Sequence, residues 1–112
     1  MLRLFTNTKL LHMTVTLNYK KLRFPVDERP YLNRQFEFIP STKTELVIKN
    51  IERKHGWLIL NLISDTGDMK TYHQIWQEER IELDGSFKYF DIHLHPASIK
   101  QDEQFSFDLE LN

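Results

Sequence analysis

The clearest structural signal in the chain lies near its end, in the stretch Gln104-Phe105-Ser106-Phe107-Asp108-Leu109-Glu110-Leu111. Apolar and polar residues alternate throughout this stretch. Because successive side chains of a β-strand point to opposite faces of the sheet, the alternation predicts a strand with one face in the core and the other in water. The residues expected to point inward are Phe105, Phe107, Leu109 and Leu111.

The segment before this strand, from Ile81 to Leu94, predicts a β-hairpin. Its turn signal is Asp84-Gly85, a dipeptide that favours tight turns between strands. A three-residue loop ending at Ser86 would pair Leu83 with Phe87 and Ile81 with Tyr89, apolar against apolar. Further on, the apolar face passes to Phe90, Ile92 and Leu94. This change of phase predicts either a β-bulge near residues 88–90 or a strand covered on both faces.

Earlier segments also have the pattern of short strands. Residues 14–19 and 34–39 alternate with period two, and residues 45–48 are strand-like. Residues 57–63 are apolar on both faces, which predicts a central strand. A strand is also expected over residues 69–76, although a short helix over residues 72–80 is the alternative there.

Together these segments predict an all-β domain. The expected architecture is an antiparallel β-sandwich (immunoglobulin-like) or a small barrel of about seven to nine short strands, with at most one short helix. A length of 112 residues fits one domain over residues 1–112. Residues 1–12 are expected to be either an extension before Met13 or an ordinary first strand.

The pattern at the end of the chain, an apolar strand ending at His95-Pro96 followed by a polar loop and the strand 104–111, resembles the last strands of immunoglobulin-like sandwiches in bacterial and phage proteins. The resemblance implies a fold class and carries no functional residue with it. A small protein of a phage or another mobile element would fit such a chain.

Composition excludes several kinds of chemistry. The sequence has no cysteine, so it forms no disulfide and has no thiolate ligand or nucleophile. Because no apolar run approaches the roughly 18 residues that span a bilayer, we expect no membrane insertion and a cytoplasmic protein. The net charge of −1 argues against a general polyanion binder. We identify no catalytic residue.

One histidine cluster suggests a metal site. Asp91, His93 and His95 occupy alternate positions of a predicted strand and should therefore share a face. Two imidazoles and a carboxylate can bind Zn or Fe, and such a site would suit a small β-barrel enzyme. The alternative is that these residues simply face water while their apolar neighbours fill the core.

A basic segment suggests a nucleic-acid site. From Met1 to Val26 the chain has five basic residues and no acid, so the part from Asp27 onward carries a charge of −6. Cations beside aromatic rings are typical of grooves that bind single-stranded nucleic acid, as in OB-like barrels. Against this, the acidic remainder would repel phosphates, and lysines also protect edge strands. The candidate residues are Tyr19, Lys20, Lys21, Arg23 and Phe24.

The interpretation we favour is a non-enzymatic module that binds another protein or assembles with its own copies. A turn-rich loop over residues 27–33 contains Arg29 and Tyr31, residue types that often anchor interfaces. Of the two tryptophans, Trp57 is expected in the core. Trp76, beside a charged stretch, is expected to be a surface anchor.

Overall fold

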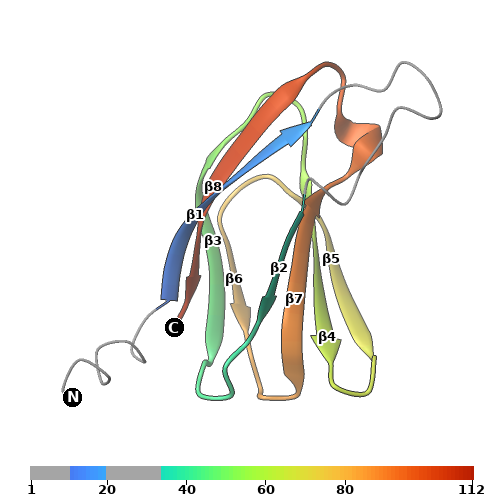
Figure 1. The fold of residues 1–112 in the computed structure, drawn as a ribbon. Coiled ribbons are helices and arrows are strands. Elements are labelled where there is room, and N and C mark those ends of the chain that lie inside the picture. Colours follow the sequence, from blue (N-terminus) through green and yellow to red (C-terminus); the bar gives the residue numbers. More distant parts are fainter. Residues whose placement is uncertain (1–10, 20–33) are drawn as a thin grey trace.

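The computed structural model describes residues 11–19 and 34–112, which form two antiparallel four-stranded sheets packed as a sandwich (Figure 1). The predicted all-β sandwich is therefore confirmed. A single turn of 3-10 helix, η2 (Pro96–Ser98), precedes the last strand. The strands are β1 (Leu11–Tyr19), β2 (Arg34–Phe38), β3 (Glu45–Glu52), β4 (Leu58–Ser64), β5 (Met69–Ile75), β6 (Glu79–Glu82), β7 (Phe87–Leu94) and β8 (Glu103–Leu111).

The strand order differs from that of an immunoglobulin domain. One sheet has the order β1-β8-β3-β6 and the other β2-β7-β4-β5. β1 pairs with β8, β2 with β7, β3 with β6 and β4 with β5, which is the pairing of one long hairpin folded into two layers. This nested order is that of a jelly roll. Immunoglobulin sandwiches group their strands differently, so the structure confirms the predicted sandwich and gives it a different strand order.

The core lies between the two sheets and follows the predicted alternation. In β8 the residues Phe105, Phe107, Leu109 and Leu111 are all buried, and the neighbouring β1 contributes Val15, Leu17 and Tyr19. The second sheet contributes Leu58, Leu60 and Leu62 from β4, together with Phe90, Ile92 and Leu94 from β7. The burial of these large apolar side chains supplies most of the driving force for folding.

The predicted hairpin over residues 81–89 is wrong. β6 pairs with β3 in one sheet, whereas β7 lies between β2 and β4 in the other, so the Asp84-Gly85-Ser86 turn connects two sheets. The Asp84 carboxylate accepts a hydrogen bond from the Ser86 backbone N–H at 2.9 Å, and Gly85 has a φ of 89°. A turn signal fixes the local backbone and leaves open which strand the chain meets next.

The predicted bulge in β7 is confirmed. Its register against β4 shifts at Lys88, between the pairs Ile63–Tyr89 and Ser64–Phe87. A second shift occurs between β4 and β5, where Gln74 has a φ of 56°. This bulge turns both Tyr72 and Ile75 toward the core, whereas Trp76, just after the strand, is exposed.

Residues 57–63 take the predicted inner position, since β4 lies between β7 and β5. Its second face is only half-buried, at Ile59 and Ile63, instead of fully covered. Residues 72–80 form strands and a connection, with no helix. Within the described part of the chain, no helix is both long and apolar enough to cross a membrane.

Candidate protein-binding face

The predicted anchors fall in different places. Arg29 and Tyr31 lie outside the described residues. Trp76 is 48% exposed just after β5, and the guanidinium carbon of Arg53 lies 5.1 Å from its ring centre. Trp57 is half-buried beside His95 instead of in the core, with 5.7 Å between ring centres. Trp76 thus has the exposure that a surface anchor needs.

The nucleic-acid candidates lie mostly outside the described residues, since Lys20, Lys21, Arg23 and Phe24 follow the end of β1. Tyr19, the last residue of β1, is only 7% exposed and belongs to the core. Its ring is therefore not open for stacking on a base, as that hypothesis requires.

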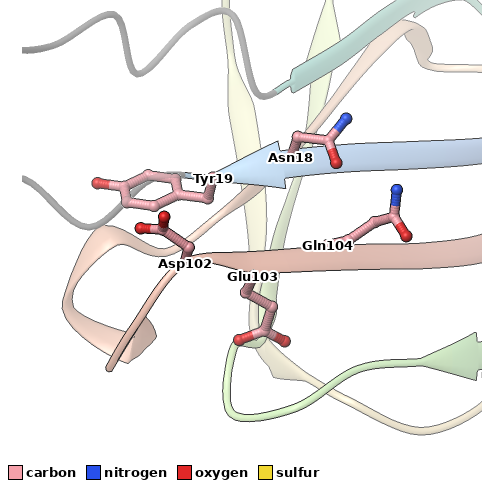
Figure 2. A pocket seen from close by; sticks show the side chains of 5 residues that line it. All are labelled: Asn18, Tyr19, Asp102, Glu103 and Gln104. Carbon is pink, nitrogen blue, oxygen red and sulfur yellow. The ribbon is translucent and has the colours of Figure 1, made fainter.

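An open hollow of about 260 Å³ lies beside Tyr19, lined by Asn18, Asp102, Glu103 and Gln104. Figure 2 shows the Glu103 side chain turned away from Tyr19, toward the loop between β3 and β4. There its carboxylate accepts backbone N–H bonds from Lys54 at 2.7 Å, His55 at 3.1 Å and Gly56 at 2.9 Å. Burial raises the pKa of Glu103, but these three donors outweigh it and leave the pKa below its ordinary value. Glu103 therefore anchors a loop that connects the two sheets.

The Asp91 side chain, at the centre of the predicted metal site, is already bonded to neighbouring strands. It is 7% exposed and accepts a hydrogen bond from Arg34 Nε at 2.8 Å and one from Asn61 Nδ2 at 3.3 Å. His93 approaches it from the same face, with 3.5 Å between Nδ1 and Oδ2. This arrangement holds three strands of one sheet in register.

His95 does not join the other two residues. Its Nδ1 accepts a hydrogen bond from the Ala97 backbone N–H at 3.0 Å, and its ring packs beside Trp57. Among the described residues, no group of three histidine or carboxylate side chains is placed to bind one metal ion. The geometry gives the Zn or Fe hypothesis no support.

The outer face of the second sheet presents a surface that the sequence did not predict. The strand registers place Phe38 opposite Tyr89, Tyr89 opposite Ile63, and Ile63 opposite Met69. This apolar row crosses all four strands, and Phe36 joins it by stacking on Tyr89 with 5.6 Å between ring centres. Phe38 meets the same tyrosine edge to face at 5.8 Å. We call this surface the aromatic face: Phe36, Phe38, Ile63, Met69 and Tyr89.

Most of the aromatic face is open to solvent. Its exposed fractions are 49% for Phe36, 56% for Phe38, 58% for Met69 and 36% for Tyr89, while Ile63 is half-buried. Isolated exposed apolar residues are ordinary on protein surfaces. A contiguous group of them across a whole sheet is a mark of an interaction site.

A row of polar side chains runs beside the aromatic face and links the four strands that carry it. Thr71 Oγ1 donates to Asn61 Oδ1 at 2.8 Å, and Asn61 in turn donates to Asp91, which also holds Arg34. The chain of hydrogen bonds thus spans β5, β4, β7 and β2. Because both rows lie on hydrogen-bonded strands, the aromatic side chains are displayed by a preorganised surface.

Sequence reasoning missed the aromatic face for an identifiable reason. In β2 the phenylalanines alternate with Gln35 and Glu37, and the pattern shows which residues share a face without showing which face is buried. The structure turns Phe36 and Phe38 outward. One usable signal existed, because Tyr89 is out of phase with the core residues of β7 and had to lie on its outer side.

No protein-family model matches the chain, and no curated protein matches it.

Proposed function

We propose that this domain is a non-enzymatic protein-interaction module that binds its partner through the aromatic face. The observation that carries the proposal is the exposed apolar row across β2, β7, β4 and β5, with three aromatic rings packed together at one end. Aromatic residues are enriched at the centres of protein interfaces, since they bury a large area with few rotatable bonds.

The surroundings of this face support the same function. Arg34 lies at one end of β2, about 40% exposed and held by Asp91, where it can bond a partner's carboxylate while the rings exclude water. Thr71 and the exposed edge of β5 supply further polar groups. An apolar centre with a polar rim is the usual anatomy of a specific interface.

The proposal can be tested by photo-crosslinking in cells that carry the gene. A photoreactive benzoylphenylalanine replaces Met69, which is at the far end of the row on β5. The matched control carries the same group in place of Thr16, an exposed residue on the outer face of the other sheet. We expect one protein to be captured at position 69 and not at position 16.

The captured protein is then identified by mass spectrometry, purified and titrated against the purified domain by calorimetry. Phe38→Ser should weaken its binding by about tenfold or more, while Thr16→Ala leaves the affinity unchanged. Equal capture at both positions, or an affinity insensitive to Phe38→Ser, would show that the aromatic face is not the binding surface.

A further inference from the structure

The outer edge of β2 has hydrogen-bonding groups directed away from its own sheet. Ile39 donates its backbone N–H to Lys88 of β7 at 2.7 Å, which makes residue 39 a hydrogen-bonded position of this antiparallel pair. Bonded and non-bonded positions alternate along such a strand, so Gln35 and Glu37 also face β7. The N–H and C=O groups of Arg34, Phe36 and Phe38 therefore point to the opposite side, where none of the described strands pairs with β2.

The sequence of this strand, Arg34-Gln35-Phe36-Glu37-Phe38, is complementary to itself in reverse. If two copies meet antiparallel about Phe36, each Gln35 faces Glu37 of the other copy, an amide donor against a carboxylate acceptor. Arg34 faces Phe38 of the other copy, a guanidinium beside an aromatic ring, and the two Phe36 rings meet at the centre. Each of these cross-strand pairs is favourable.

The neighbouring registers are worse. A pairing centred on Glu37 places two carboxylates directly opposite each other, and a pairing centred on Gln35 brings fewer of the outward backbone groups of Arg34–Phe38 into register. Only the pairing about Phe36 uses the outward N–H and C=O groups of residues 34, 36 and 38 in both copies. The backbone direction and the side-chain chemistry thus favour the same register.

We infer that a second copy of this chain pairs with the first, β2 against β2, around a two-fold axis at Phe36. The β2-β7-β4-β5 sheets of the two copies become one eight-stranded sheet, and the two aromatic faces form one continuous surface. This inference rests on the proposed function, because the dimer would serve that function by doubling the binding face. A two-fold contact of this kind closes on itself and produces a dimer. The contact is small, so the dimer should be reversible and dependent on concentration.

Because the sequence has no cysteine, a single introduced thiol reports the register directly. In the inferred dimer, two copies of Phe36→Cys bring their Cα atoms to about 5.5 Å, within the range of a disulfide. The matched control is Phe38→Cys, on the same face of the same strand. There the two thiols are displaced by four residues along the strands, about 13 Å, which is too far to bridge.

Under mild oxidation we expect Phe36→Cys to form a covalent dimer and Phe38→Cys to remain monomeric, as seen on non-reducing gels. Comparable cross-linking of both variants, or none at position 36, would overturn the inference.

A second measurement isolates the contribution of the backbone hydrogen bond of residue 36 to the dimer. Phe36→Pro removes an N–H group that bonds no residue of β7, so the fold should persist, as circular dichroism can check. Relative to Phe36→Ala, which also lacks the ring, Phe36→Pro should raise the dimer dissociation constant about tenfold or more in sedimentation velocity. Equal dissociation constants for the two variants would overturn the inference.

The two proposals fail separately. If Met69 captures a different protein while Phe36→Cys stays monomeric, the aromatic face binds a partner and the inferred dimer is wrong. If Phe36→Cys dimerises while the Met69 and Thr16 probes give the same products, the edge contact exists and the proposed binding face is wrong.

Discussion

The two sheets of this sandwich share one core but have very different outer faces. The outer face of β1-β8-β3 is a polar network, in which Asp108 accepts hydrogen bonds from Thr14 at 2.9 Å and Asn50 at 2.8 Å, and Lys49 pairs with Glu110 at 2.7 Å. The corresponding face of the other sheet carries the aromatic face instead. A polar network that is satisfied within the molecule has little to offer a partner, whereas exposed rings gain by being covered.

Each outer face has a carboxylate that joins three strands, and the difference between these two carboxylates gives the largest expected effect. Asp91 is 7% exposed and joins β2, β7 and β4, whereas Asp108 is 22% exposed and joins β1, β8 and β3. Asp91→Ala should lower the free energy of unfolding by about 1–3 kcal/mol, since it leaves Arg34 and Asn61 without their buried acceptor. Asp108→Ala should cost less, because water can replace its hydrogen bonds.

Urea unfolding followed by tryptophan fluorescence measures both values, and Trp57 and Trp76 provide the signal. Asp91→Asn is the matched control, because it keeps the shape and an acceptor oxygen while removing the charge, and should lie between wild type and Asp91→Ala. If Asp108→Ala lowered the free energy of unfolding more than Asp91→Ala does, the hydrogen bonds of Asp91 beside the aromatic face would not be the more stabilising set.

Sequence reasoning recovered the core better than the surface. The strands at residues 14–19 and 104–111 were predictable, because their apolar faces do lie in the core, as alternation normally implies. Predicting the aromatic face would have required the register between four strands. Two connections, Asp84-Gly85 and Asp65-Thr66-Gly67-Asp68, show why this register could not be predicted. Both contain a glycine with positive φ, yet only the second closes a hairpin within one sheet. Local turn chemistry does not encode which sheet the next strand joins.

The candidate site was predictable only in part. Exposure of Trp76 follows from its charged neighbours, while the convergence of Phe36, Tyr89 and Ile63 comes from residues far apart in sequence. Asp91 and His93 do share a face as their spacing predicts, but their neighbours across the sheet, Arg34 and Asn61, could not be identified from that spacing.

Acid should weaken the polar network. Hydrogen bonds from Asn50 and Thr14 hold the pKa of Asp108 below its ordinary value, and Lys49 does the same for Glu110. A carboxylate whose pKa is lower in the folded state stabilises the fold above its unfolded pKa, and this contribution is lost as the pH falls through the folded value. Stability should therefore decline from about pH 5 downward, measured as the free energy of unfolding at several pH values.

The double variant Asp108→Asn with Glu110→Gln should show a shallower decline over the same pH range, although Glu103 and Asp84, whose pKa values are also lowered, keep part of it. The control is Glu82→Gln, an exposed carboxylate on β6. An unchanged slope in the double variant would show that the polar network contributes nothing to the acid response.

The smallest effect on stability is expected on the aromatic face itself. Phe38 is more than half exposed and lies on an edge strand, so its ring contributes little to the core. Phe38→Ser should lower the free energy of unfolding by only about 0.5–1 kcal/mol, mostly through loss of the contact with Tyr89. Phe90→Ser, one strand away but fully buried, is the matched control and should cost several times more. A loss at Phe38 as large as that at Phe90 would mean that the ring belongs to the folding core. A small loss, together with weakened partner binding, would separate the two roles of this sheet: its inner face stabilises the domain, while its apolar outer face contributes little to folding.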